Sequence, residues 1–205
     1  MSKSVILGYS GHSFVVIDAY MKSGFTVHAY SEKVNQTHNP YNLEYLGYEG
    51  DESFDGWSKG YEFILGIGDN LIRENVANHI IKKGERLVKV IHPSSIISSN
   101  VDIGEGSFIA AGVIINPLVS IGKNVIINTG ALVEHEGLID DNVHIAPGAV
   151  VAGNVKIGHG SFIGANAVIK EGVEIGNDVI VGAGAVVIDN IRSQTKVVGN
   201  PARIL

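Results

Sequence analysis

Residues 97–132 read ISSNVD-IGEGSF-IAAGVI-INPLVS-IGKNVI-INTGAL, with isoleucine at every sixth position. The period continues in both directions, from Ile91 to Val187, so that seventeen consecutive sixth positions hold Ile or Val. Small or β-branched residues recur four positions after most of them, and glycine often follows directly. An α-helix, with about 3.6 residues per turn, cannot use a period of six. The repeat therefore predicts short strands joined by corners.

Six residues make one short strand and one corner. The aliphatic residue points inward, while Gly, Asn or Asp tolerates the unusual backbone angles of the corner. Three such sides close a triangular coil of about 18 residues, and stacked coils bury a continuous aliphatic column. Neighbouring coils, about 4.8 Å apart, pair as parallel strands. The seventeen hexads predict five to six coils, and because nothing interrupts them, no long loop leaves this prism.

The first ninety residues have a different pattern. They predict two helices and four strands, with no assignable structure at 31–60: strands at 4–8, 25–30, 61–67 and 86–91, and helices at 13–23 and 70–83. Strands that alternate with helices indicate a small parallel sheet. We therefore expect a Rossmann-like α/β domain over residues 1–90, and a parallel β-helix with a short C-terminal tail over residues 91–205.

Composition excludes several classes of protein. Of the 205 residues, 45% are hydrophobic and 18% are charged, and the net charge is −6. This balance is typical of a globular chain and provides no basic excess for nucleic acid. The chain has no cysteine, which excludes disulfides, thiolate-bound metals and a cysteine nucleophile. Without a signal peptide pattern or an apolar run of about 18 residues, we expect a soluble, cytoplasmic protein.

Two glycine turns follow expected strands. Gly8-Tyr9-Ser10-Gly11 comes after the first strand, and Gly66-Ile67-Gly68-Asp69 ends the third. Both should lie at the carboxyl edge of the sheet, where open α/β sheets bind ligands and backbone N–H groups can hold a phosphate. The complete G-x-G-x-x-G fingerprint is absent. A nucleotide site and a pair of plain strand-to-helix turns are therefore both compatible with these residues.

One of the eight histidines lies among carboxylates, in Glu134-His135-Glu136. His135 is the third residue of its hexad and should project outward, and a flanking carboxylate can orient an imidazole for acid–base work. Gly153 follows 18 residues later and should lie directly beside it, leaving a notch and a backbone N–H for an oxyanion. The alternative is a solvated polar corner. His144 should lie on another side of the prism, so only neighbouring prisms could bring both histidines to one groove.

Zinc is the competing chemistry, because the gamma-class carbonic anhydrases hold it with three histidines on a β-helix. That resemblance would require a His-x4-His pair. The spacings among His135, His144 and His159 are 9 and 15 residues. We therefore predict no metal site.

Several segments together resemble one family, and they extend over almost the whole chain: Gly8–His12, Asn128–Glu136, His144, Ala152–Gly158 and Val198–Arg203. The family is that of the bacterial hexapeptide-repeat acetyltransferases that act on UDP-4-amino sugars, together with the sialic-acid O-acetyltransferases. The resemblance implies a left-handed β-helix, acetyl-CoA as co-substrate, and a homotrimer with active sites between subunits.

The resemblance also implies roles for individual residues. His135 would be the general base, and Glu136 would raise its basicity. Acetyl-CoA would contact His144, Gly153 and Ala165. The nucleotide sugar would contact Ser10, Gly11, His12, Ser31, Glu32 and Gly68. The family's nucleotide-sugar members carry two acidic residues where this chain has Ser31-Glu32, which is a departure from the family pattern.

The expected reaction is N-acetylation of a UDP-4-amino-4,6-dideoxy sugar. Because the chain has no cysteine, direct transfer in a ternary complex is favoured over an acyl-cysteine intermediate. O-acetylation of a sialic acid is the alternative within the same family. A non-catalytic β-helix protein that binds a nucleotide sugar is the alternative from another class.

Overall fold

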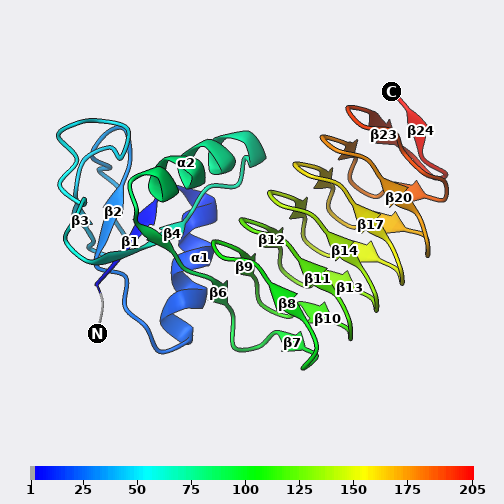
Figure 1. Cartoon of the computed structure of the whole chain (residues 1–205), viewed down its shortest axis with the longest axis horizontal. Helices are drawn as coiled ribbons and strands as arrows, with labels where there is room; N and C mark the ends of the chain where they lie inside the picture. The colour runs from blue at the N-terminus through cyan, green and yellow to red at the C-terminus, as the bar shows by residue number, and fades with distance from the viewer. Residues whose placement is uncertain (1–2) are drawn as a thin grey trace.

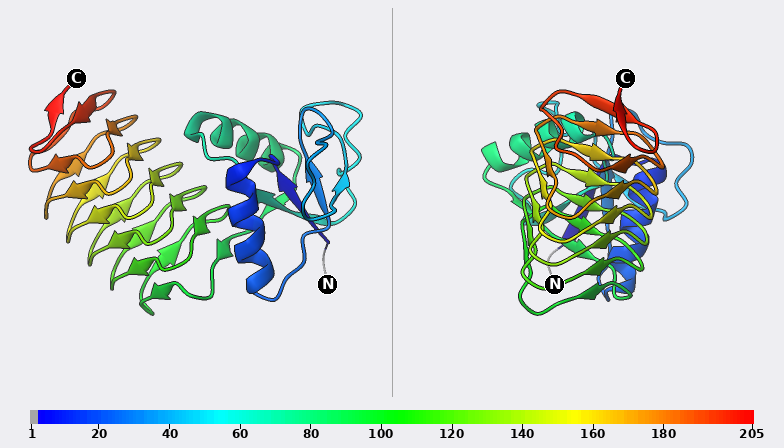
Figure 2. Two further views of the ribbon diagram at one scale, coloured as in Figure 1. Left: turned by 180° about the vertical axis from the view of Figure 1, so that it is seen from behind. Right: turned by 90° about the vertical axis from the view of Figure 1, so that its right-hand side faces the viewer.

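The computed structural model describes residues 3–205 and has two parts that differ in architecture. An α/β domain is followed by a long prism of stacked coils, which carries the C-terminus at its far end (Figure 1). Two further views show the coils stacked one after another from the α/β domain to the C-terminus (Figure 2). Among the described residues, none of the helices has the length and apolarity needed to cross a membrane. The expected fold class, an α/β domain followed by a left-handed parallel β-helix, is confirmed.

The α/β domain contains one parallel sheet and two helices. Its strands are β1 (Lys3–Leu7), β2 (Ala29–Ser31), β3 (Glu44–Tyr45), β4 (Tyr61–Leu65) and β5 (Arg86–Leu87), in the spatial order β3-β2-β1-β4-β5. The helices are α1 (Gly11–Lys22) and α2 (Asn70–Lys82). Asp69 begins α2 as its N-cap, because its Oδ1 accepts a hydrogen bond of 2.9 Å from the Ile72 N–H. Both helices therefore start directly at the glycine turns.

Two of the expected strands differ in the structure. The strand expected at 25–30 begins only at Ala29, and Phe25 instead stacks on Tyr20, with 5.0 Å between the ring centroids. The strand expected at 86–91 is two strands in two sheets. The Val88 N–H donates to Phe63 of the α/β sheet, and the Val90 N–H donates to Ser107 of the prism. The first half of this short segment thus pairs with the α/β sheet and the second half with the prism, so that one expected strand becomes two.

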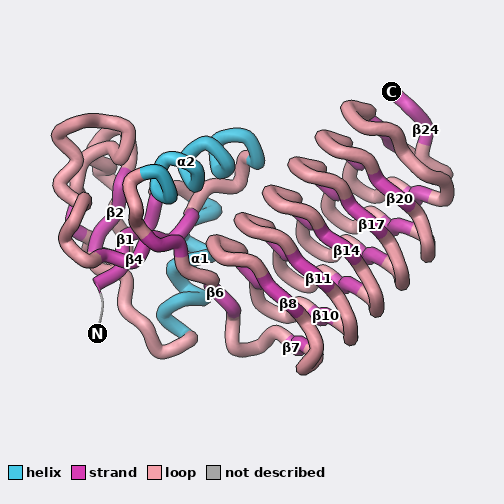
Figure 3. The backbone as a smooth tube through the Cα atoms, in the orientation of Figure 1, coloured by secondary structure: helices cyan, strands magenta, loops and turns pink. Residues whose placement is uncertain are grey.

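The prism is built from three sheets, which we name after their first strands (Figure 3). The β6 sheet contains β6 (Val90–Ile91), β9 (Phe108–Ile109), β12 (Ile126–Ile127), β15 (His144–Ile145), β18 (Phe162–Ile163), β21 (Ile180–Val181), β23 (Lys196–Val198) and the antiparallel β24 (Arg203–Ile204). The β7 sheet contains β7 (Ile96–Ile97), β10 (Ile114–Ile115), β13 (Leu132–Val133), β16 (Val150–Val151), β19 (Val168–Ile169) and β22 (Val186–Val187). The β8 sheet contains β8 (Asp102–Ile103), β11 (Ser120–Ile121), β14 (Leu138–Ile139), β17 (Lys156–Ile157) and β20 (Glu174–Ile175).

The hexads have the expected packing and the expected corners. From Ile109 to Val187, every sixth residue is at most 3% exposed, whereas Ile91, at the junction, is 36% exposed. From Gly106 to Asp178 and Gly184, every sixth residue has a positive φ. Twelve of these fourteen corner residues are Gly, Asn or Asp, and the other two are Leu118 and Glu136. The aliphatic column drives the stacking, and the corner residues permit the turns.

Candidate active site

His135 lies on the corner that follows β13, and its side chain projects outward, 51% exposed. Its Nδ1 is 3.1 Å from Oε2 of Glu136. With the Nδ1 proton donated to this carboxylate, the lone pair lies on Nε2, which faces away from the partner. The pair can therefore accept a proton at Nε2 and stabilise the resulting charge.

Gly153 lies directly beside the His135 ring, as the 18-residue spacing predicts. A Cβ atom at this position would be 2.6 Å from His135 Cε1 and 2.7 Å from Nε2. One hydrogen bond fixes the neighbouring corners, because the Asn154 N–H donates to the His135 carbonyl over 2.9 Å. The ring thus fills the space that a side chain at 153 would need.

Glu136 adopts a backbone conformation that is unfavourable for glutamate. Its φ is 59°, at a corner position where the prism otherwise uses Gly, Asn or Asp, except at Leu118. A non-glycine residue with a bulky side chain costs about 1 kcal/mol or more in this region. Strain of this kind concentrates at functional sites, and here it places a carboxylate beside an imidazole.

A second group of expected residues lies where the α/β domain meets the β6 sheet. His144 of β15 is 8% exposed, and its Nδ1 is 3.2 Å from the Gly68 carbonyl oxygen. Its Nε2 is 3.2 Å from Asn128 Nδ2. The His12 ring lies 6.2 Å from the His144 ring, centroid to centroid. Residues from the two glycine turns and from the prism thus meet at one place.

Arg73 of α2 holds this place together, and sequence reasoning missed it. The side chain is 1% exposed. Its Nε donates to the Asn124 carbonyl over 2.8 Å, its Nη2 to the Asn142 carbonyl over 2.8 Å, and its Nη1 to the Gly68 carbonyl over 3.1 Å. The first two carbonyls belong to corners of the prism. Arg73 therefore joins α2 and the Gly68 turn to the β-helix.

Burial and the Arg73 charge determine the protonation of both histidines. Burial, and secondarily the nearby guanidinium, lower the pKa of His12 and of His144 to about 4. Burial also lowers the pKa of Arg73, to about 10. At neutral pH Arg73 is therefore charged and both imidazoles are neutral. His12 Nε2 is buried and has no hydrogen-bond partner within residues 3–205.

A cavity of about 410 Å³ opens at the carboxyl ends of β1, β2 and β4. Of the expected nucleotide-sugar residues, four line it: Ser10, Ser31, Glu32 and Gly68. Gly11 is not among its lining residues, and His12 lies instead against the prism, 5.8 Å from the Phe108 ring. Glu32 is held at the rim by the Tyr9 N–H, which donates to its Oε2 over 3.1 Å. The structure therefore gathers most, but not all, of this set.

Two further residues of the cavity come from the segment that had no assignable structure. Tyr48 and Glu49 follow β3 and line the cavity opposite the glycine turns. Glu49 is 5% exposed, and the Ser31 hydroxyl donates to its Oε2. In sequence, Glu49 is an ordinary acidic residue between Tyr48 and Gly50, so no signal marks it.

The expected acetyl-CoA residues do not form one site within a single chain. Ala165, on the corner between β18 and β19, is half-buried, and Gly153 lies on the corner between β16 and β17. His144 lies on the outer face of the β6 sheet. His135 and Gly153 thus belong to one edge of the prism, and Ala165 to the next. Their roles in binding remain predictions.

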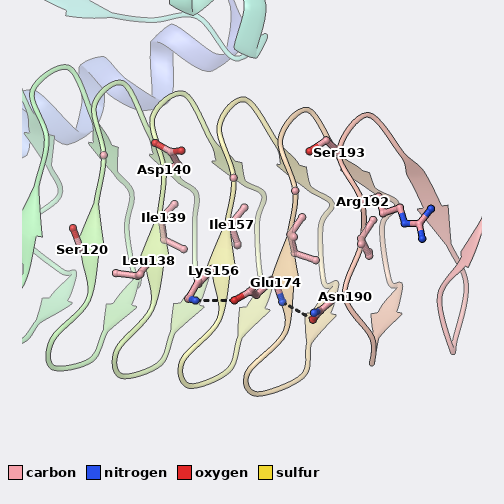
Figure 4. Close-up of a pocket in the computed structure, with 15 residues that line it drawn as sticks. Ser120, Leu138, Ile139, Asp140, Lys156, Ile157, Glu174, Asn190, Arg192 and Ser193 are labelled. Atoms are coloured by element: carbon pink, nitrogen blue, oxygen red, sulfur yellow. Dashed lines mark hydrogen bonds and ion pairs between the residues drawn. The ribbon is translucent and has the colours of Figure 1, made fainter.

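A larger, shallow hollow of about 880 Å³ extends over the outer face of the β8 sheet (Figure 4). None of the expected site residues lines it. Lys156 and Glu174 form an ion pair of 2.7 Å there, with both side chains more than half exposed. A solvated ion pair of this kind contributes little to stability. His135 and the carboxyl edge of the α/β sheet therefore form the candidate site.

Comparisons with known proteins identify the family. The family model described as "PglD N-terminal domain" matches residues 3–80, and "Bacterial transferase hexapeptide (six repeats)" matches residues 136–171 and 154–189. The acetyltransferase domain of PglB from Neisseria gonorrhoeae FA1090 is 30% identical, with a TM-score of 0.93 and 100% of both chains covered. A structure of that domain contains acetyl coenzyme A.

Two other solved structures are similar over the whole chain. PerB from Caulobacter crescentus, in complex with CoA and GDP-perosamine, is 34% identical, with a TM-score of 0.90 and coverage of 100% of this chain and 98% of that chain. WeeI from Acinetobacter baumannii AYE is 28% identical, with a TM-score of 0.91 and full coverage of both chains. The glycine turns, the hexads and these similarities lead to one conclusion: the chain belongs to the hexapeptide-repeat sugar acetyltransferases that carry a PglD N-terminal domain.

Proposed function

We propose that this protein transfers the acetyl group of acetyl-CoA to the amine of a nucleotide-linked amino sugar, in the cytoplasm. The observation that carries the proposal is the His135–Glu136 pair, with a contact of 3.1 Å, packed on Gly153. The 34% identical PerB, which has been solved with CoA and GDP-perosamine, supports a nucleotide-linked acceptor.

In this reaction His135 Nε2 takes a proton from the acceptor amine as the nitrogen attacks the thioester carbonyl. Glu136 stabilises the imidazolium through Nδ1. A backbone N–H on the Gly153 side of the ring stabilises the tetrahedral oxyanion, which collapses to the amide and the CoA thiolate. The transfer is direct, since no cysteine is present to carry the acyl group.

The outer face of the β7 sheet supports the proposal of a homotrimer. Its outward side chains form a continuous aliphatic column: Ile96, Ile114, Leu132, Val150, Val168 and Val186. The corresponding positions of the β8 sheet are Asp102, Ser120, Leu138, Lys156 and Glu174. An exposed apolar stripe on one side of a soluble prism is typical of an interface, and identical faces around a threefold axis close into a ring.

This packing also assembles the catalytic site. In such a trimer the β7 sheet of each prism faces the threefold axis. The two edges that border this sheet then face two different neighbouring copies. His135 and Gly153 lie on the edge between the β7 and β8 sheets, while Ala165 lies on the edge between the β6 and β7 sheets. Around the axis, the first edge of one copy meets the second edge of the next. We therefore propose that His135 acts on acceptor and acetyl-CoA held largely by the neighbouring copy, with His144, Gly153 and Ala165 contacting acetyl-CoA.

The cavity at the glycine turns would hold the nucleotide. Ser10, the N-cap of α1, brings the N-terminus of this helix to the cavity, where a phosphate would be favoured, and Glu32, directly after β2, suits a ribose hydroxyl. Ser10, Gly11, His12, Ser31 and Gly68 would complete the contacts. Taken alone, the family resemblance implies a UDP-4-amino-4,6-dideoxy sugar, so the acceptor panel contains both UDP- and GDP-linked sugars.

Release of free CoA thiol, measured with a panel of acceptors, tests the proposal. The panel contains UDP- and GDP-linked 4-amino sugars, the same amino sugar without a nucleotide, and free and CMP-linked sialic acid. We expect thiol release only with a nucleotide-linked amino sugar, and a loss of at least about a hundredfold in His135→Ala. Release with sialic acid alone would replace the proposal by O-acetylation. Binding of a nucleotide sugar without thiol release from any acceptor would indicate a non-catalytic binding protein.

A further inference from the structure

The carboxylate of Glu49 is the one acidic group that the structure buries in the wall of the nucleotide cavity. Glu49 is 5% exposed, and its own N–H donates to Ser31 Oγ over 2.9 Å. The Ser31 hydroxyl donates in return to Glu49 Oε2, and Ser31 has no exposed surface. This reciprocal pair fixes the carboxylate in one orientation at the cavity.

The charge of Glu49 is not matched by the protein. Within residues 3–205, no Lys, Arg or His nitrogen lies within 4.0 Å of its oxygens, and Oε1 has no hydrogen-bond donor. A buried carboxylate is stable only with donors that replace its lost hydration. Because Glu49 lines the cavity, a ligand can supply those donors.

The order of the strands indicates which part of a nucleotide reaches Glu49. The sheet runs β3-β2-β1-β4, with the phosphate-binding turn after β1, Glu32 after β2 and Glu49 after β3. A nucleotide with its phosphates at the first turn and its ribose at Glu32 extends its base toward Tyr48 and Glu49. The aromatic ring of Tyr48 lines the same end of the cavity and can stack on a base.

Only one common base suits a fixed carboxylate at this end. Guanine presents two adjacent donors, N1–H and the N2 amino group. They can donate to the two carboxylate oxygens of Glu49, or both to one of these oxygens. Uracil presents a single N–H between two carbonyl oxygens, which a carboxylate repels, and adenine and cytosine pair one amino donor with an acceptor. We propose that Glu49 selects a guanine nucleotide, so that the acceptor is a GDP-linked rather than a UDP-linked amino sugar. This inference rests on the proposed function.

Calorimetric titration of the intact protein with free nucleotides tests it. The probes are GDP, IDP, which lacks the N2 amino group, UDP and 2′-deoxy-GDP. We expect GDP to bind about tenfold or more tightly than IDP or UDP, as for a paired set of hydrogen bonds to one base edge. Glu49→Gln should lose that preference over IDP, while the exposed Glu52→Gln should keep it. Acetyl-CoA binding and thermal melting of each variant report on folding.

The outcomes separate the two proposals. UDP binding as tightly as GDP, or a GDP preference that survives in Glu49→Gln, would overturn the inference and leave acetyl transfer untouched. Equal binding of GDP and IDP with weak binding of 2′-deoxy-GDP would overturn it in favour of a ribose contact. The comparison in the wild-type protein stands even where the variant does not fold. Acetyl-CoA binding without binding of any nucleotide would overturn both the inference and the nucleotide-linked acceptor.

Discussion

The imidazole of His135 stands over Gly153, one coil further along the prism, where a Cβ atom would lie 2.6 Å from its Cε1. No real Cβ contact is that short, so the ring position and the glycine depend on each other. The equivalent corner one coil further along carries Glu171, whose side chain is exposed. A side chain is therefore accommodated at 171, whereas a side chain at 153 would displace the His135 ring. In the proposed reaction, this relationship determines where His135 would receive the proton.

Gly153→Ala should therefore impair catalysis while leaving the fold intact. The methyl group forces the imidazole aside, and a displacement of about 1 Å at a reacting group costs up to about a hundredfold in rate. We expect kcat to fall at least about tenfold, as measured by thiol release. Glu171→Ala, at the equivalent corner, is the matched control and should keep full activity. Equal activity of Gly153→Ala and wild type would refute the placement of the base.

Glu136 should trade stability for activity. Its φ of 59° suits Asn, which occupies the same corner position at 124, 142, 154 and 166. Glu136→Asn should raise the free energy of unfolding by about 1 kcal/mol and lower kcat, because the His135 partner is lost. Leu118→Asn, at the corner one coil earlier with a φ of 65°, should gain similar stability without losing activity. Denaturant titration and thiol release measure the two effects, and an active Glu136→Asn enzyme would contradict the role of the carboxylate.

The buried His144 and the half-buried His12 should make the fold sensitive to mild acid. Burial lowers the pKa of His144 and of His12 to about 4, below the value of about 6.5 in the unfolded chain. The unfolded chain takes up these protons at a higher pH than the folded protein does. The stability that the two neutral imidazoles contribute is therefore complete above about pH 6.5 and is lost as the pH falls toward 4. Between pH 7.5 and 5.5 the loss amounts to about 1 kcal/mol for each histidine.

Urea unfolding at these two pH values tests this sensitivity. His144→Gln can still donate to the Gly68 carbonyl and does not titrate, so its loss of stability should be smaller than that of wild type by about 1 kcal/mol. An identical pH dependence in both proteins would show that His144 does not titrate as proposed.

The β7 sheet should control assembly. Val150→Asp places a charge in the middle of the outward aliphatic column, so we expect sedimentation to show monomers and thiol release to fall to background. Leu138→Asp, on the β8 sheet, should assemble as the wild-type protein does, because that face already carries Lys156 and Glu174. An active monomer of Val150→Asp would contradict a site shared between copies.

The prism could be predicted from the sequence because its six-residue period is a local pattern. Each hexad needs one inward aliphatic residue and one tolerant corner, and both are visible within six residues. The relation of His135 to Gly153 follows from the same register, since one coil is about 18 residues long. The segment at 86–91 shows the limit of local reasoning: a strand pattern does not reveal that two sheets divide one segment between them.

Arg73 and Glu49 were not predictable, because their environments are made by distant residues. Arg73 bonds to carbonyls 51 and 69 positions away, and in sequence it looks like any basic residue on an exposed helix face. Glu49 is buried because β3 places its loop beside Ser31, 18 residues earlier in the chain. Neither position follows from a period or a motif, since tertiary contacts create both.

Mixing two inactive variants gives the most direct test of acetyl transfer between neighbouring copies. His135→Ala lacks the base, while Ser10→Trp keeps the base and blocks the nucleotide cavity, which Ser10 lines. After unfolding and refolding together in equal amounts, random trimers should recover roughly one quarter of the wild-type rate of thiol release, because one site in four combines intact halves. Recovery of that activity is the predicted result; two variants that stay inactive when refolded together into trimers would contradict a site built from His135 of one copy and the cavity of the next.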